Sequence, residues 1–292
     1  MRRFGTWPGP AGRLIGLFLP RRDLYKARAL RPAHDGTARR QLQPGIERTL
    51  EMAVGLSIVV PVKDEAQNVV SLAREIARAV AGEDAEIVFV DDGSSDSTAA
   101  ALIALKDELP NLRVLAHGRN IGQSRGIRTG VRAARGAIVV TLDGDGQNDP
   151  ADIPRLLTVL RNDAAGERIG MVSGVRVKRN DGASKRWASR FANGLRSRLL
   201  NDGAVDSGCG LKAFRRDVYL ALPYFDNMHR FMIALVRREG YEVRFVDVNH
   251  RAREHGKSKY NNLNRALVGI RDMFGVRWLQ RRHKGAVEPR EV

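Results

Sequence analysis

Short apolar runs alternate with helical segments between residues 56 and 142, and this alternation restricts the fold more than any other feature of the chain. The runs rich in apolar and β-branched residues, as buried strands are, cover 56–60, 86–90, 112–116 and 137–142. The helical segments between them cover 68–80, 97–109 and 122–135. This order predicts an α/β fold in which helices cover both faces of a mostly parallel sheet.

Acidic clusters follow three of these strands. They are Lys63-Asp64-Glu65 after the first strand, Asp91-Asp92 after the second and Asp143 to Gln147 after the fourth. The carboxyl ends of parallel strands lie at one edge of the sheet, and ligands of α/β proteins bind there. The sequence therefore predicts one binding site to which all three clusters contribute.

The turn Asp143-Gly144-Asp145-Gly146-Gln147 carries the clearest chemistry. Mg²⁺ and Mn²⁺ prefer oxygen ligands, and Mg²⁺ often binds one or two carboxylates together with substrate phosphates. Two carboxylates one residue apart can face one cation, and Gln147 can add a carbonyl oxygen. The turn also resembles a calcium loop, but the spacing and terminal Glu of an EF-hand are absent. We therefore expect Mg²⁺ or Mn²⁺ beside a nucleotide diphosphate.

Asp92 is the expected nucleotide contact in the second cluster, because a carboxylate at a strand end can accept hydrogen bonds from a base or a ribose. Ser94 to Asp96 are expected to cap the following helix. The chain contains neither a GxGxxG sequence nor a Walker sequence. Their absence argues against a dinucleotide site and against a P-loop.

The second half of the chain continues the α/β pattern less regularly. Helices are expected over 152–161, 185–200, 217–222 and 228–239, strands over 170–177 and 243–248, and a glycine-bearing loop and strand over 206–214. A last helix over 261–280 has apolar residues at 263, 267, 270, 274 and 278 and arginines at 265, 271 and 277. Such a stripe suits either a helix at a membrane interface or a helix that packs on the core.

The formal net charge is +17, and most of it lies in the two ends of the chain. Residues 1–50 hold eleven Lys or Arg against three Asp or Glu, and residues 250–292 hold eleven against four. Basic ends suit nucleic acid or the anionic face of a membrane. The α/β region is close to neutral and carries no nucleic-acid motif, so we expect a membrane surface and no nucleic acid.

Three regions follow from these patterns. Residues 1–54 form a basic extension that we expect to be poorly ordered, 55–260 form the α/β domain, and 261–292 form an amphipathic helix with a basic tail. No apolar run reaches the ~20 residues of a membrane span. We therefore expect a cytoplasmic protein, peripheral at the inner face of the membrane. The single cysteine, Cys209, excludes a disulfide framework and a Cys-based zinc site within the chain.

The motifs together resemble those of the family 2 inverting glycosyltransferases, which have the GT-A fold, a three-layer sandwich around a mostly parallel sheet. The segments that carry the resemblance, in the family's order and spacing, are LSIVVPVKDE, VFVDDGSSDST, RNIGQSRGIRTG and TLDGDGQNDP. Within the family, the later segments SGVRVKRND, DSGCGLKAFRRDV and REHGKSKY are similar to the polyprenyl-phosphate glycosyltransferases, including dolichyl-phosphate mannose synthase. The resemblance covers residues 55–262.

The resemblance implies roles for individual residues. The implied nucleotide-sugar contacts are Pro61, Lys63, Glu65, Val90, Asp92, Asp143 and Gly144, and the implied metal ligands are Asp143, Asp145 and Gln147. The cations implied to hold the donor diphosphate or the acceptor phosphate are Arg176, Arg253 and Lys259. The chain departs from the family at three positions, because Lys63 replaces a frequent aromatic residue and Gly144 and Gly146 replace larger ones.

The expected reaction moves a sugar, with inversion, from a GDP- or UDP-linked donor to undecaprenyl or dolichyl phosphate. Asp145, Arg176, Asp206, Arg253 and Lys259 are the expected catalytic residues. A phosphate monoester has a second pKa of ~6 and is mostly a dianion at pH 7, so it can attack without a protein base. Asp206 is the candidate base if the acceptor is instead a hydroxyl of a polysaccharide or glycolipid. The protein could instead reach its lipid through a membrane-protein partner. An alternative function is that of a basic nucleic-acid-binding protein.

Overall fold

The structure is a computed structural model that describes residues 54–162, 169–177, 194, 196–253 and 262–285, with only the backbone described over 262–267. The predicted extension over 1–54 lies almost wholly outside the described residues. So do most of the predicted helix over 185–200 and the candidate Lys259.

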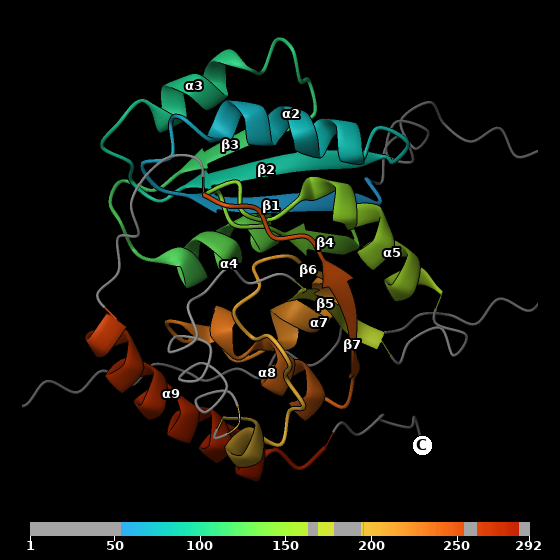
Figure 1. Cartoon of the computed structure of the whole chain (residues 1–292), viewed down its shortest axis with the longest axis vertical. Helices are drawn as coiled ribbons and strands as arrows, with labels where there is room; N and C mark the ends of the chain where they lie inside the picture. Colours follow the sequence, from blue (N-terminus) through green and yellow to red (C-terminus); the bar gives the residue numbers. More distant parts are fainter. Residues whose placement is uncertain (1–53, 163–168, 178–193, 195, 254–261, 286–292) are drawn as a thin grey trace, which may run out of the picture. The chain divides into compact units, whose positions relative to one another are not determined.

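Seven strands form a single sheet in the order β3-β2-β1-β4-β6-β5-β7 (Figure 1). Their bounds are Leu56–Val62 (β1), Ala85–Asp91 (β2), Leu112–Ala116 (β3), Ile138–Thr141 (β4), Ile169–Arg176 (β5), Lys212–Arg215 (β6) and Glu242–Val248 (β7). Only β6 is antiparallel to its neighbours, β4 and β5. The predicted mostly parallel sheet is therefore confirmed.

Helices cover both faces of the sheet, because successive side chains of each strand point to opposite sides. In β1, Ile58 and Val60 pack in one buried cluster, and Val59 packs in the other. The first cluster includes helices α2 (Val69–Ala79), α3 (Thr98–Ala104) and α5 (Ile153–Arg161). The second includes α4 (Gln123–Ala133), α7 (Arg216–Ala221), α8 (Met232–Arg238) and α9 (Asn262–Arg282).

The sheet brings the ends of several strands to one edge. β1, β2 and β4 run parallel, so the residues that follow them, including Asp92 and Asp143, lie at the same edge. Because β6 runs the other way, its first residue, Lys212, begins at the edge where β4 ends, and it pairs with Thr141. Lys212, which was not among the predicted site residues, therefore lies beside the acidic turn.

Two predicted helices differ from those observed. The helix expected over 97–109 ends at Ala104 and continues as turns. The helix expected from 228 begins instead as the 3₁₀ turn η2 (Met228–Arg230), and α8 starts at Met232. Asn227 has a left-handed backbone with φ of 64°, which prevents a regular helix from starting there. A further 3₁₀ turn, η1 (Pro150–Asp152), precedes α5.

Helix α9 has two different apolar faces. Met273 and Val276 are buried in the second cluster, whereas Ile270, Phe274 and Trp278 are exposed. The exposed residues belong to the stripe identified in the sequence, so this part of the stripe faces away from the core. No helix in the described part of the chain combines the length and apolarity of a membrane span.

Glu86 joins three parts of the fold from a buried position on β2. Its carboxylate accepts hydrogen bonds from the Ser57 hydroxyl (2.7 Å), the Arg135 amide (2.6 Å) and the Arg113 guanidinium. Burial alone would raise the pKa of Glu86, but these hydrogen bonds outweigh burial and lower it. The ionised carboxylate therefore stabilises the packing of β1, β2 and the loop after α4.

We expect Glu86→Gln to lower the free energy of unfolding by about 1–3 kcal/mol at pH 7, because it loses charge-assisted hydrogen bonds. Folding lowers the pKa of Glu86. Its contribution to the free energy of unfolding is therefore present above the pKa that Glu86 has in the unfolded chain, and it is lost as pH falls through the pKa in the folded protein. Urea denaturation at pH 7 and at pH 4 measures both effects. Asp107→Asn, at an exposed carboxylate, is the control, and equal losses in the two variants would contradict the assignment.

Candidate active site

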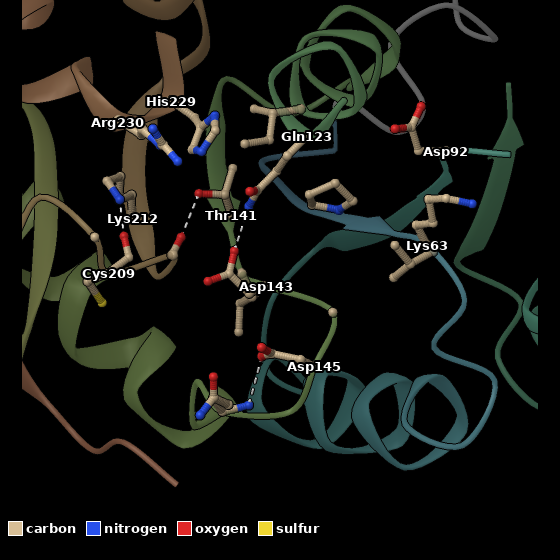
Figure 2. Close-up of a pocket in the computed structure, with 18 of the residues that line it drawn as sticks. Lys63, Asp92, Gln123, Thr141, Asp143, Asp145, Cys209, Lys212, His229 and Arg230 are labelled. Atoms are coloured by element: carbon tan, nitrogen blue, oxygen red, sulfur yellow. Dashed lines mark hydrogen bonds between the residues drawn. The ribbon is translucent and has the colours of Figure 1, made fainter. Parts of the chain in front are cut away.

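A cavity of about 750 Å³ opens at this edge of the sheet, and Figure 2 shows the side chains around it. The sequence-predicted residues that line it are Pro61, Lys63, Glu65, Asp92, Asp143, Gly144, Asp145, Gln147, Arg176 and Arg253. Residues more than 190 positions apart in the chain therefore meet in one place.

Val90 and Asp206 are not in the cavity wall. The side chain of Val90 is fully buried in the second cluster, with Ile127 and Val131 of α4. Asp206 is also buried and lies behind Arg176. The whole residue Val90, backbone included, is 0% exposed and does not line the cavity.

Asp143 lies at the centre of the cavity, just after β4. Its Oδ1 accepts a 2.7 Å hydrogen bond from Nε2 of Gln123, and its backbone N–H donates to Oδ1 of Asn148 at 3.2 Å. Desolvation by the surrounding protein and the charge of Asp145 raise its pKa to about 6, although Lys212 and Arg176 act in the opposite direction. The carboxylate is thus held in an environment that disfavours its charge in the absence of a cation.

Asp145 and Gln147 extend the acidic turn toward a second arginine. The Asp145 carboxylate lies 3.3 Å from the Arg253 guanidinium. Oδ1 of Asp145 accepts a hydrogen bond from the backbone N–H of Gln147 at 3.2 Å. Arg253 also contacts Glu65 at 3.0 Å. Arg253 therefore links the turn after β4 to the loop after β1.

The two glycine positions of the turn require glycine for different structural reasons. A Cβ on Gly144 would lie 2.5 Å from Cγ1 of Val62 and 3.1 Å from the Pro61 carbonyl oxygen. Gly146 has open space around it, but its φ of +73° favours glycine. The departures from the family pattern thus correspond to close packing at one position and a left-handed backbone at the other.

Asp92 organises the opposite side of the cavity. Its carboxylate accepts from the amides of Ile121 (3.0 Å) and Gly122 (2.7 Å) and contacts Nδ1 of His117 at 2.8 Å. Lys63 donates to the carbonyl of Gly93 at 3.0 Å. Both side chains therefore fix loops around the space where the sequence predicted a nucleotide.

Arg176 and Lys212 make the other side of the cavity positive. Arg176 holds Asp206 through two hydrogen bonds, from Nε at 2.7 Å and from Nη2 at 2.8 Å. Lys212 is buried and donates to the carbonyl of Cys209. Burial lowers the pKa of Lys212, while the charges of Cys209, Asp143 and Asp206 oppose this shift. Cys209 itself is fully buried.

The cavity wall also contains residues that were not predicted, among them Gln123, Lys212, His229 and Arg230. Gln123 and Lys212 lie within segments that resemble the family, and the charge of Lys212 in an apolar strand is a usable signal. His229 and Arg230 have no spacing that marks them. They reach the cavity through the turn η2, which only the folded chain shows.

The residues of the turn suit a divalent cation. Asp143 and Asp145 supply two carboxylates, and Gln147 lies on the same cavity wall. Among the described residues no group of three or more His, Cys, Asp or Glu could hold a metal alone. Two carboxylates with substrate phosphates as the remaining ligands are what Mg²⁺ commonly accepts.

Comparison with solved structures agrees with the fold. Glucosyl-3-phosphoglycerate synthase from Mycobacterium tuberculosis, in complex with Mn²⁺, UDP and glucosyl-3-phosphoglycerate, aligns with a TM-score of 0.60 and 20% identity. The alignment covers 77% of this chain and 79% of that one. The same enzyme with Mg²⁺ and UDP aligns with a TM-score of 0.58 at 19% identity. The predicted GT-A fold is therefore confirmed.

Curated relatives are closer in sequence. Dodecaprenyl-phosphate galacturonate synthase from Rhizobium johnstonii is 35% identical over 77% of this chain and 67% of its own length. Undecaprenyl-phosphate 4-deoxy-4-formamido-L-arabinose transferase from Edwardsiella ictaluri is 36% identical over 70% of this chain and 62% of its own length. The chain thus spans about two thirds of the length of these relatives. The sequence model described as Glycosyl transferase family 2 matches residues 57–222, more than half of the chain, and the protein belongs to that family.

Proposed function

We propose that this protein transfers a sugar from a nucleotide sugar to a polyprenyl phosphate, with inversion at the anomeric carbon and with a divalent cation. The observation that carries the proposal is the position of Asp143 and Asp145 between a nucleotide-side wall and a cationic wall of one cavity. Relatives named for transfer to dodecaprenyl and undecaprenyl phosphate support the same acceptor class. The donor carries GDP or UDP.

The nucleotide fits the part of the cavity beside Asp92 and Lys63. Asp92 holds the Ile121 and Gly122 amides and keeps this loop in place for a base or ribose. Pro61, Glu65 and Gly144 form the adjoining wall. In this proposal Asp143, Asp145 and Gln147 hold Mg²⁺ or Mn²⁺, which when bound neutralises charge on the leaving diphosphate.

The chemical step joins an acceptor phosphate oxygen to the anomeric carbon while the bond from that carbon to the donor diphosphate breaks. The electron pair of the broken bond leaves with the nucleoside diphosphate, which is already anionic and needs no proton. Arg176 and Arg253 place positive charge in the cavity where negative charge passes from the acceptor phosphate to the leaving diphosphate, and such fixed charge is usually a large catalytic contribution. Lys259 is assigned the same role from the family motif and lies outside the described residues.

A protein base is not needed for this acceptor, because a phosphate monoester is mostly a dianion at pH 7. The position of Asp206 fits this view. Both of its carboxylate oxygens accept hydrogen bonds from Arg176, so its main contact is with that guanidinium. We assign Asp206 the task of orienting Arg176, and a hydroxyl acceptor, which needs a base, is less well supported.

The acceptor lipid implies that the protein works at a membrane surface, and we assign it to the inner face. The exposed stripe Ile270, Phe274 and Trp278 on α9 is 47%, 62% and 58% exposed. Arg271, Arg281 and Arg282 lie on the same helix and are exposed. An apolar stripe beside arginines suits anionic lipid headgroups. A membrane-protein partner at the same surface is the alternative.

We expect the double variant Phe274→Ser, Trp278→Ser to bind vesicles of anionic lipid about tenfold or more weakly, because two apolar side chains no longer enter the interface. Co-sedimentation with vesicles that contain phosphatidylglycerol measures the change. Ile103→Ser on α3, where Ile103 is 57% exposed, is the matched control. Equal weakening by the control would exclude α9 as the contact.

The function itself is tested with Mn²⁺ or Mg²⁺, undecaprenyl phosphate and a panel of GDP- and UDP-linked sugars, followed by extraction of the lipid phase. Labelled sugar should enter the lipid with at least one donor and should require the cation. A label that enters hydroxyl acceptors and never the lipid phosphate would overturn the proposal. The same panel identifies the donor sugar.

A further inference from the structure

We propose that His229 and Arg230 bind the phosphate group of the acceptor. This proposal rests on the proposed function and assigns the acceptor side of the same cavity. Both residues line the cavity from the turn η2, between Asn227 and α8. In Figure 2 they lie with Lys212 on one side of Asp143, and Asp92 and Lys63 lie on the other. The donor nucleotide and the acceptor phosphate would then approach the acidic turn from opposite sides.

The sheet order supports this division of the cavity. Asp92 follows β2, on one side of the central strand β4, whereas β6 and β5, which carry Lys212 and Arg176, lie on the other side. The turn η2 belongs to the second buried cluster through Met228. A nucleotide held beside Asp92 therefore leaves the cavity wall around η2 for the second substrate.

Buried polar groups hold the turn η2 in position. The Ser124 hydroxyl, which is 4% exposed, lies 2.7 Å from Nδ1 of His229 and accepts from the His229 amide at 3.3 Å. The contact at Nδ1 orients the imidazole ring of His229 on this wall of the cavity. The Ser124 hydroxyl thus holds both the ring and the backbone of His229.

Arg230 is supported from its backbone. Arg196 donates from Nη2 to the Arg230 carbonyl at 3.2 Å and forms a buried ion pair with Asp202 at 2.8 Å. The Arg196 guanidinium also lies 5.6 Å from the ring centre of Phe231. Arg196 thus contacts both the backbone of this turn and the ring that follows it.

The arginines of the cavity wall, Arg230 included, lie near protein carboxylates. Arg176 is paired with Asp206, and Arg253 is paired with Glu65 and Asp145. Arg230 also acts on Asp272 of α9. Burial raises the pKa of Asp272, and the positive charge of Arg230 opposes this rise. A phosphate dianion carries three acceptor oxygens and about two charges, so guanidinium and imidazole donors suit it.

The neighbours of Arg230 also suit an acceptor that carries a lipid chain. A Cβ placed on Gly269 of α9 would lie 3.9 Å from Nη1 of Arg230. Arg230 is therefore close to the helix whose exposed stripe is Ile270, Phe274 and Trp278. A phosphate on a membrane-embedded chain would reach Arg230 beside α9.

Binding of citronellyl phosphate, a short and soluble isoprenyl phosphate, tests the assignment by calorimetry on the full chain. We expect Arg230→Met to weaken binding about 10- to 100-fold, as the loss of a charge-assisted phosphate contact does. Arg230→Lys should restore part of the affinity, and His229→Asn should also weaken binding. Binding of the nucleoside diphosphate with Mn²⁺ should change by less than about twofold in all three variants.

The matched control is Arg237→Met, which removes an exposed arginine from α8 outside the cavity wall. The alcohol citronellol should bind wild type and Arg230→Met equally, since it lacks the phosphate. Unchanged binding of citronellyl phosphate in Arg230→Met would overturn the inference. So would an equal loss of nucleotide binding, which would mark Arg230 as structural, or a wild type that does not bind citronellyl phosphate. If wild type binds it through Arg230 but transfers no sugar to lipid phosphate, the proposed function fails and the phosphate site stands.

Discussion

Asp143→Asn should lower kcat for sugar transfer by about 10²–10³-fold, the usual effect of removing one group that stabilises the transition-state charge. The substitution keeps the shape of the side chain and an oxygen for the hydrogen bond from Gln123. What it removes is the negative charge that a divalent cation requires. Initial rates at saturating donor and acceptor, with Mg²⁺ and with Mn²⁺, measure the loss.

The same variant should be more stable than wild type in the absence of metal above pH 6. Folding raises the pKa of Asp143 from 3.8 to about 6, chiefly by desolvation. The folded protein therefore binds this proton more tightly than the unfolded chain, and the ionised carboxylate destabilises the fold once pH exceeds 6. The stability gain of Asp143→Asn is on the order of 1–3 kcal/mol at pH 8 and shrinks toward zero as pH falls below 4.

Thermal denaturation with a chelator at pH 8 and pH 5 tests this dependence. Adding Mn²⁺ should raise the melting temperature of wild type and not that of Asp143→Asn. Asp107→Asn, which changes an exposed carboxylate outside the cavity, should leave both activity and stability close to wild type. A variant that keeps its activity, or that loses stability at pH 8, would contradict the assignment of Asp143.

Gly210→Ala should lower kcat/KM about 100-fold or more, because a displacement of about 1 Å at a catalytic group has effects of this size. A Cβ on Gly210 would lie 2.3 Å from Oδ2 and 2.7 Å from Oδ1 of Asp143. Neither side can move easily. The Gly210 carbonyl accepts a 3.0 Å hydrogen bond from the Thr141 hydroxyl on β4, and Asp143 follows the same strand.

The control for this variant is Gly82→Ala, at a glycine with nothing within 4 Å of the added Cβ. Activity and the affinity for Mn²⁺ with nucleotide should both fall in Gly210→Ala, since the carboxylate that binds the cation is displaced. Overpacking should also destabilise the fold by about 1–3 kcal/mol. Normal activity in Gly210→Ala would mean that the loop before β6 shifts without moving Asp143.

The early part of the chain could be interpreted from its sequence because its signals are local. Strands β1 to β4 are short apolar runs bounded by polar turns, and their alternation with helices restricts them to a parallel sheet. Parallel strands bring their carboxyl ends to one edge, so Asp92 and Asp143 were predicted to lie in one site. They line one cavity in the structure.

The acceptor side depends on contacts between distant parts of the chain. Lys212 reaches the cavity because β6 runs antiparallel between β4 and β5, a pairing that no local pattern specifies. Arg176 was correctly expected in the cavity, but its pairing with Asp206, 30 positions away, became visible only in the fold. Val90 was expected to contact the nucleotide, and the direction of its side chain on β2 places it in the core.

Sequence by itself determined the α/β order, the acidic edge and the two carboxylates after β4, because periodicity and strand ends are encoded by neighbouring residues. Tertiary structure alone decided which apolar face of α9 is exposed, since Val276 and Phe274 are equally apolar in the sequence and differ only in what packs against them. It also decided that His229 and Arg230 face the cavity. The left-handed Asn227 and the buried Ser124 and Arg196 direct that turn, and their contacts span up to 105 positions of the chain.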